Sequence, residues 1–329
     1  MDMNYLASII NSTLRSTTPV LFAALGSAIC SKVGIFNIAL EGQMLIASFV
    51  SVVVSYYTKS VLLAILAGVF ASSIIGLVVA ILQVKYKAAD MVVGTSINLL
   101  ISALTAIFLY VILGVKGSFS SPDLVSMSKI NILSFLNGTF IARIFENLTI
   151  LDYISYLVAI LIYVFLYKTI KGFRSLSVGI NKEAAKSLGV NPTKVQMLMV
   201  IASGALCGLG GCALSLGQVT LFTENMTAGR GFIAMAAASM AQNHPLASIA
   251  SSLFFGACQA FGVAIQNIVP SQLTKAIPYL ATIIALAVFG SRLNRAKKEN
   301  RRVENEKIWW IDAIFTKVWK CSLVWKWSS

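Results

Sequence analysis

Long apolar runs without charge dominate this sequence and predict its helices. Residues 60–84, 91–115 and 195–223 contain no charged side chain, and residues 231–274 contain no acidic or basic residue besides His244. A helix needs about 20 consecutive apolar residues to cross the hydrocarbon core of a bilayer, so each run can supply at least one crossing. The sequence lacks the alternating segments of about ten residues that form an outer-membrane barrel. The pattern therefore predicts an all-α polytopic membrane protein.

The composition agrees with this class and excludes several others. Of the 329 residues, 57% are hydrophobic and 12% are charged, and the mean hydropathy is +0.83. A soluble domain usually carries about a quarter charged residues. These values exclude a soluble enzyme, a secreted disulfide scaffold and a nucleic-acid-binding domain. The five cysteines form no Cys-x-x-Cys pair, so we expect them to be small packing residues rather than disulfides or metal ligands.

About nine membrane-spanning helices are expected, with eight and ten as the neighbouring possibilities. The apolar segments lie near residues 17–31, 36–57, 61–84, 91–114, 152–168, 197–217, 229–243, 246–268 and 277–291. Residues 1–16 form a weakly amphipathic amino-terminal segment ahead of the transmembrane domain, residues 17–291, and we expect no signal peptide. Six Lys or Arg residues lie between 168 and 194 and ten lie after 291. The positive-inside rule therefore places the loop 170–196 and the carboxyl end in the cytoplasm.

Two short segments resemble each other and suggest an internal repeat. Asn37–Ala47 and Asn225–Ala234 share a pattern of asparagine, small residues and glycine when one residue is skipped. On the expected topology the first segment enters the membrane from inside and the second from outside. Such glycine-interrupted pairs are typical of two inverted repeats, which line a transport pathway near the midplane. Chance similarity between alanine- and glycine-rich membrane segments is the alternative.

Charged groups inside apolar segments are the main candidates for chemistry. The chain has no GxxxxGK[ST] motif for ATP phosphates, so uphill transport would need an ion gradient or another polypeptide. Burying a charge in the membrane costs about 2.5–3.5 kcal/mol. Glu41 either caps the helical turn that follows Asn37 or faces a pathway, and it is the main candidate for ion coupling. Arg230 either opens a half-helix between Gly229 and Gly231 or snorkels to the outer interface.

Glycine spacing and one histidine add two structural expectations. Gly204 and Gly208 form a GxxxG pair, which favours close helix packing. His244 precedes Pro245 at an expected helix break and is interpreted as a turn residue rather than a proton relay. No acid pair or His/Cys cluster in the sequence indicates a catalytic or metal site, and no cofactor is expected.

The most informative polar stretch, residues 174–194, joins two apolar segments. We expect a short helix from Asn181 to Leu188, capped by Asn181 and ended by Gly189. Its apolar residues would share one side: Ala184, Ala185 and Leu188. On the cytoplasmic face, this helix is either a rigid lever that another protein holds or an ordinary connecting loop.

The same stretch resembles a known motif. Glu183-Ala184-Ala185 followed by Gly189 is similar to the E-A-A-x-x-x-G loop of ABC importer permeases, through which the ATPase subunit holds the membrane domain. Other segments resemble the permease group for branched-chain amino acids, ribose and nucleosides, and mainly its nucleoside branch: Thr18–Gly26, Gly34–Met44, Val93–Leu100, Gly204–Gly211 and Ala228–Ala234. The similarity covers about residues 15–291. The Leu-Pro pair that ends the loop in other importers is missing after Gly189.

This resemblance implies a transmembrane subunit of an ATP-driven importer for nucleosides in a bacterial plasma membrane. It implies a cytoplasmic ABC ATPase, a second permease subunit of different sequence, an external substrate-binding lipoprotein and no nucleic acid. The expected ATPase-coupling residues are Glu183, Ala184, Ala185, Leu188 and Gly189. The expected pathway residues are Asn37, Glu41, Gly42, Asn98, Gly229, Arg230 and Gly231. The alternatives are a ribose or branched-chain amino acid permease, a gradient-driven transporter and a non-transporting scaffold.

Residues 292–329 fall outside that resemblance. All five tryptophans lie in this segment, interleaved with lysines. Aromatic rings beside lysines suit a helix in the inner headgroup layer of the bilayer. The segment is therefore either such an interfacial helix or simply a basic cytoplasmic tail.

Overall fold

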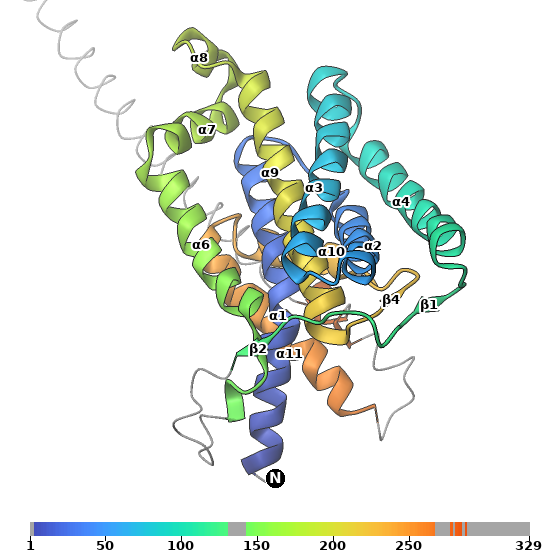
Figure 1. The fold of residues 1–329 in the computed structure, drawn as a ribbon. Coiled ribbons are helices and arrows are strands. Elements are labelled where there is room, and N and C mark those ends of the chain that lie inside the picture. Colours follow the sequence, from blue (N-terminus) through green and yellow to red (C-terminus); the bar gives the residue numbers. More distant parts are fainter. Residues whose placement is uncertain (1–2, 131–142, 267–276, 279, 285–286, 288–329) are drawn as a thin grey trace, which may run out of the picture. The chain divides into compact units, whose positions relative to one another are not determined.

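The computed structural model describes residues 3–130, 143–266, 277–278, 280–284 and 287. The chain divides into two units, Met1–Thr282 and Ile283–Ser329, and the fold that follows is that of the first unit. Its helices are α1 (Met3–Lys32), α2 (Leu40–Thr58), α3 (Val61–Ala80), α4 (Asp90–Leu113), α6 (Ile150–Lys168), α7 (Ile170–Ile180), α8 (Lys182–Ser187), α9 (Pro192–Cys212), α10 (Arg230–Met240) and α11 (Pro245–Ala264) (Figure 1).

Short irregular elements extend and connect these helices. The π-helical segments η1 (Ile81–Lys85) and η3 (Ala213–Val219) continue α3 and α9. Four two-residue strands form two antiparallel ribbons, in which β1 (Ser118–Phe119) pairs with β4 (Phe222–Thr223) and β2 (Lys129–Ile130) pairs with β3 (Leu148–Thr149). The registers place Ser118 opposite Thr223 and Lys129 opposite Thr149.

The described residues contain six helical segments that are long and apolar enough to cross a membrane. These are Leu40–Thr58, Val61–Lys85, Asp90–Leu113, Ile150–Lys168, Pro192–Val219 and Pro245–Ala264. They confirm the prediction of a helical, polytopic membrane protein. The expected apolar segment 277–291 is described only in part, at 277–278, 280–284 and 287, and the tail 292–329 lies entirely outside the described residues.

The amino-terminal boundary differs from the one that the sequence suggested. The segments expected at 1–16 and 17–31 belong to one continuous helix, α1, of 30 residues with Pro19 inside it. Proline cannot donate to the carbonyl four residues earlier, which here belongs to Arg15. The side chain of Gln218 donates to that carbonyl instead, at 2.5 Å. A contact from a distant part of the chain therefore satisfies the acceptor that the proline leaves open.

The segment near 229–243 also differs from expectation. It holds α10, which has 11 residues. At 1.5 Å per residue this helix rises about 16 Å, about half the thickness of the hydrocarbon core. The prediction of a full crossing at this position is wrong, and the segment is a half-helix followed by α11.

Two helices, α1 and α9, run in opposite directions through the bundle (Figure 1). α1 packs against α9, α10 and α11, and α9 packs against α2 and α3. Two glycines of α9 permit its close contact with α3. A Cβ on Gly204 would lie 2.7 Å from the carbonyl oxygen of Ser72, and a Cβ on Gly208 would lie 2.8 Å from the Cα of Val69, so neither position has room for a side chain. The hydroxyl of Ser72 also donates to the carbonyl of Gly204 at 2.6 Å. The expected close packing at the GxxxG pair is confirmed.

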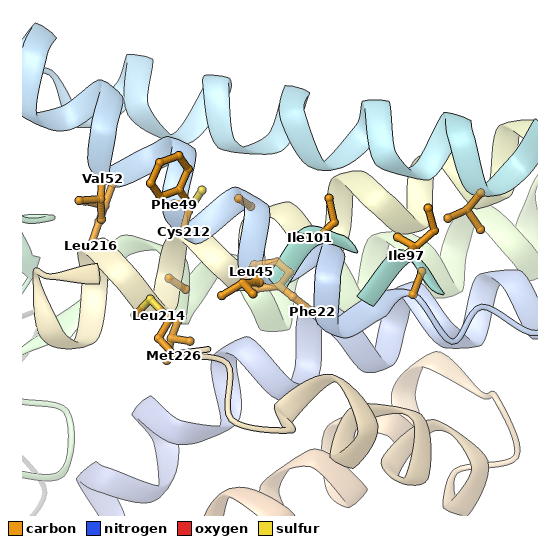
Figure 2. Packing of buried hydrophobic residues seen from close by; sticks show 14 of the residues in the cluster. Phe22, Leu45, Phe49, Val52, Ile97, Ile101, Cys212, Leu214, Leu216 and Met226 are labelled. Carbon is orange, nitrogen blue, oxygen red and sulfur yellow. The ribbon is translucent and has the colours of Figure 1, made fainter. Parts of the chain in front are cut away.

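The apolar core of this unit gathers side chains from α1, α2, α4, α9 and η3. Figure 2 shows Phe22 of α1 beside Leu45 of α2, with Ile97 and Ile101 of α4 and Leu214 of η3 nearby. These side chains are fully or almost fully buried. The core therefore fixes α2 and α4 beside the central pair, which positions the polar groups described next.

The α3–α9 contact gives a first prediction. Gly204→Leu introduces a side chain where the Ser72 carbonyl leaves no room, and overpacking of this kind costs about 1–3 kcal/mol. We expect a lower melting temperature in detergent, measured by fluorescence-detected size-exclusion after heating. The matched control is Ala205→Leu, because Ala205 borders a cavity of 330 Å³ that can accept the added atoms. Equal melting temperatures for Gly204→Leu and the wild type would contradict the packing argument.

Candidate functional site

Glu41 joins the beginnings of two helices. It lies in the first turn of α2, and its carboxylate reaches the first turn of α10. Oε1 accepts a hydrogen bond from the backbone N–H of Gly229 at 2.7 Å, and Oε2 accepts one from Gly231 at 2.6 Å. A helix start carries unpaired N–H groups and a partial positive charge, which a carboxylate satisfies. Glu41 therefore caps α10 from a neighbouring helix.

Asn98 of α4 performs the equivalent task for α2. Its Oδ1 accepts a hydrogen bond from the N–H of Gly42 at 2.8 Å, and its Nδ2 donates to the carbonyl of Ile38 at 3.0 Å. α2 has no side-chain cap from its own Ala39. The start of each of these two helices is thus held by a polar side chain from another helix.

Glycines allow these backbones to come close. A Cβ on Gly42 would lie 3.0 Å from Oδ1 of Asn98, and one on Gly231 would lie 2.6 Å from the backbone nitrogen of Glu41. Gly229, the residue before α10, has φ +77°, which a residue with a side chain adopts only with strain. The three glycines expected in the pathway are therefore required by the geometry of the two helix starts.

Asn37 lies deeper than the sequence suggested. Its side chain is 1% exposed, and it donates to the hydroxyl of Ser203 at 3.1 Å and to Oε1 of Gln43 at 3.2 Å. Its own Oδ1 accepts from the N–H of Ala39 at 3.0 Å. In this conformation Asn37 fixes the break between α1 and α2 onto α9, and its side chain does not face an open space.

Arg230 turns back toward the loop that precedes it. Its Nη1 donates to the carbonyl of Met226 at 3.1 Å and to that of Thr227 at 3.4 Å. The side chain is half-buried. The structure thus brings Arg230 into the same cluster as Glu41, Gly229 and Gly231, where it braces the loop before α10.

A polar stripe runs along α4, and of its members only Asn98 was expected at the site. Thr95, Asn98 and Ser102 are spaced at i, i+3 and i+7, which places them on one face of an otherwise apolar helix. The hydroxyl of Ser102 donates to Oδ1 of Asn225 at 2.6 Å, so the stripe reaches the loop before α10. Thr95 is exposed and Asn98 and Ser102 are half-exposed. The helical spacing of polar residues within 91–114 was the signal that could have revealed it.

The short helix in the expected coupling loop is present. α8 spans Lys182–Ser187, and the side chain of Asn181 accepts from the N–H groups of Glu183 at 3.0 Å and Ala184 at 3.1 Å. Gly189 ends it with φ +78°. The expected shared apolar side is wrong, because Ala185 is buried whereas Ala184 and Leu188 are exposed. Leu188 lies past the last helical residue, so helical spacing no longer orients it.

A cleft of 840 Å³ lies beside α8. It is bounded by Gly34, Ile35, Gln83, Val84, Lys87, Ala88, Asp90, Lys182, Glu183, Lys186, Gly189, Val190, Asn191, Pro192, Thr193 and Gln196. Two residues that line this cleft form hydrogen bonds with the α1–α2 break. Gln196 donates to the carbonyl of Val33 at 2.8 Å, and Asp90 accepts from the N–H of Phe36 at 3.2 Å. The first turns of α9 and α4 are therefore tied to the α1–α2 break, next to α8.

Other residues have structural surroundings. His244 directly precedes α11, as expected for a turn residue. Its ring centroid lies 5.5 Å from that of Tyr163, which is tilted against it, and 5.4 Å from that of Tyr167, on which it stacks. The cysteines of the described residues are unpaired, and Cys30, Cys207 and Cys212 are buried. Within the ranges that the structure describes, no group of three His, Cys, Asp or Glu residues could hold a metal ion.

The Glu41 contacts give a second prediction. In Glu41→Gln the amide keeps one acceptor oxygen and no charge, so the start of α10 loses a charge-assisted pair. A hydrogen bond to a charged group contributes about 1.5–3 kcal/mol. We expect faster hydrogen–deuterium exchange in peptides that cover residues 229–233.

The matched control for that experiment is Glu224→Gln. Glu224 is exposed, and its carboxylate accepts one backbone hydrogen bond, from Gly117 at 2.9 Å. The control should change exchange near residue 117 and leave residues 229–233 as in the wild type. Unchanged exchange at 229–233 in Glu41→Gln would refute the capping role.

Comparison with known proteins agrees with this architecture. Residues 9–286 match the family described as "Branched-chain amino acid transport system / permease component". The chain is 32% identical to the nucleoside ABC transporter permease NupC of Lactococcus lactis subsp. cremoris over 299 residues, which is 87% of this chain and 93% of NupC. It is 29% identical to the guanosine ABC transporter permease NupQ of Bacillus subtilis over 312 residues, which is 90% of this chain and 97% of NupQ.

A further relative carries a different name. The chain is 27% identical to the putative glucose ABC transporter permease TsgC13 of Haloferax volcanii over 313 residues, which is 87% of this chain and 92% of TsgC13. No solved structure matches the chain. The match to the family extends over most of the chain and includes both capped helix starts and α8. The chain belongs to the family of branched-chain amino acid transport system permease components.

Proposed function

We propose that this protein is the membrane subunit of an ATP-driven importer that carries nucleosides. The observation that supports this most directly is the similarity to relatives named as nucleoside and guanosine permeases over 87–90% of the chain. The chain is a permease component, so ATP hydrolysis belongs to a separate ATPase subunit. We further propose a second permease chain of different sequence, an external lipoprotein receptor and a cytoplasmic carboxyl end in a bacterial plasma membrane.

The polar groups near the two helix starts suit a neutral polar substrate. Thr95, Ser102 and Asn225 present hydroxyl and amide groups, which can donate and accept hydrogen bonds without carrying charge. Nucleosides carry several hydrogen-bonding groups and no net charge. In the proposed pathway these side chains offer exchangeable partners to the passing substrate, with Glu41 and Arg230 holding the backbone around it.

An arrangement of two inverted repeats is supported by the packing pattern. Each half would contain a long helix, a break, a shorter helix and another long helix, namely α1, α2 and α3 in one half and α9, α10 and α11 in the other. α1 packs on α10 and α11, while α9 packs reciprocally on α2 and α3. Crossed packing of this kind is what a two-fold axis in the membrane plane would produce. With α1 counted beside the six membrane-length segments and α10 left out as a half-helix, eight crossings follow if residues 277–291 also span.

The proposed mechanism links the ATPase to the pathway through α8. Movement of α8 displaces the start of α9, where Gln196 holds the carbonyl of Val33 in the α1–α2 break. That break leads directly into α2, whose Glu41 holds the start of α10. In this proposal a push on α8 passes through the short link 188–191 to α9, through the Gln196–Val33 hydrogen bond to the α1–α2 break, and through Glu41 to the start of α10.

A third prediction concerns the lever. In proteoliposomes with the partner ATPase, second permease and receptor, Glu183→Arg should abolish ATP-driven nucleoside uptake, because it reverses a charge on the exposed first turn of α8. Gly189→Trp should act similarly by straining the φ +78° position. The matched control, Glu146→Arg, reverses an exposed charge in the segment expected outside and should retain uptake. Full uptake by both α8 variants would refute the lever.

A fourth prediction separates the energy sources. Both oxygens of Glu41 accept backbone hydrogen bonds, so this carboxylate serves as a cap and not as an open ion-coupling group. We expect uptake to stop on ATP depletion and to persist when an ionophore collapses the ion gradients. The opposite result would favour the gradient-driven alternative, and absence of any uptake phenotype on deletion would favour a scaffold.

A sugar is the second candidate substrate, because one relative is named a putative glucose permease. Competition settles the choice between the two classes. Excess unlabelled guanosine should suppress uptake of labelled adenosine, whereas excess glucose or ribose should leave it unchanged. Suppression by a sugar alone would replace the nucleoside assignment.

A further inference from the structure

The surface helix α7 has its apolar face turned away from the protein. Its buried residues are small or compact, namely Gly172, Ser175 and Val178. A Cβ on Gly172 would meet the carbonyl of Phe165, and one on Gly179 would meet the carbonyl of Lys32, so α7 rests closely on the ends of α6 and α1. Figure 1 shows α7 lying across the end of α6.

The opposite face of α7 is apolar and open. Ile170 is 74% exposed, Phe173 is 57% exposed and Ile180 is 86% exposed. In a surface helix of a soluble protein such residues would face the core. Here the core side carries the small residues, so the apolar side requires another environment.

Basic residues flank this apolar face. Lys168, Lys171 and Arg174 are exposed, and no acidic residue occurs between Lys168 and Lys182. An amphipathic helix with apolar side chains on one face and cations beside them binds at the boundary between headgroups and acyl chains. The cations add attraction to anionic lipids, at about 1 kcal/mol for each basic residue near the surface.

Continuity with α6 identifies lipid as the occupant. α6 is an apolar membrane-length helix whose outward residues Leu157, Leu161 and Val164 are exposed. Thr169, the one residue between the two helices, caps α7 by accepting from the N–H of Gly172 at 3.1 Å. α7 therefore begins where the apolar surface of α6 ends and lies across it, as an interfacial helix would.

We propose that α7 is a membrane-surface anchor that binds anionic phospholipid headgroups on the cytoplasmic side. Ile170, Phe173 and Ile180 enter the acyl boundary, and Lys171 and Arg174 contact the lipid phosphates. Asn181 both ends α7 and caps α8, so the depth of α7 in the membrane sets the position of α8. Only that last consequence rests on the proposed function; lipid binding itself does not.

The first test measures depth. The full-length protein, with the subunits that copurify, is placed in nanodiscs that contain phosphatidylglycerol. Cys258→Ala and Cys321→Ala remove two cysteines, and a nitroxide spin label is attached to Ile180→Cys. The label should be accessible to oxygen and protected from a water-soluble nickel chelate. A label on Lys116→Cys, an exposed loop position, should show the reverse. Nickel access at 180, or protection from both reagents by a protein neighbour, would overturn the proposal.

The second test measures charge recognition. Replacing phosphatidylcholine with phosphatidylglycerol should raise the melting temperature of the wild type. Lys171→Gln with Arg174→Gln should weaken the apparent affinity for phosphatidylglycerol on the order of thirty-fold, from two lost surface charges. The matched control, Lys186→Gln with Lys194→Gln, removes the same charge from α8 and α9 and should keep the wild-type response. Equal responses of the two double variants would overturn the proposal.

Discussion

The capped starts of α2 and α10 are the constraint on which the rest of the structure depends. Four unpaired N–H groups at a helix start are costly away from water, so a helix that begins within the membrane requires acceptors. Glu41 supplies both oxygens to the start of α10, and Asn98 supplies one to the start of α2. Each cap comes from another helix, so neither break can persist unless α2, α4 and α10 are assembled together.

Small residues make that assembly possible. In lipid there is no hydrophobic force to join apolar helices, and close packing with interhelical hydrogen bonds takes its place. Gly204 and Gly208 bring α9 onto α3, and the Ser72 hydroxyl uses the same approach to reach a backbone carbonyl. Gln218 likewise supplies the donor that Pro19 cannot, which lets α1 remain continuous. The contacts that pack these helices closely therefore also supply hydrogen bonds to their backbone carbonyl groups.

Polar groups in this permease have two separable tasks. Asn37, Glu41 and Arg230 bond mainly to backbone groups or buried neighbours and hold the breaks in shape. Thr95 and Asn225 are exposed and present groups to the outside of the bundle. An importer whose receptor selects the substrate needs only weak contacts along the route, and exchangeable hydroxyl and amide groups meet that need. α7 and α8 meet at Asn181, which connects the proposed lipid-binding helix to the proposed lever.

The sequence alone determined the membrane class, the helical character, the capped helix at 181–189 and the family resemblance, because these depend on composition, local spacing and short motifs. It also identified candidate pathway residues that the structure brings together, namely Glu41, Gly42, Asn98, Gly229, Arg230 and Gly231. Only the tertiary structure decided that Glu41 caps α10, that α1 continues through Pro19 and that Leu188 is exposed while Ala185 is buried. Each of these outcomes depends on which distant segment lies within hydrogen-bonding or packing reach, and no local pattern in the chain encodes that distance.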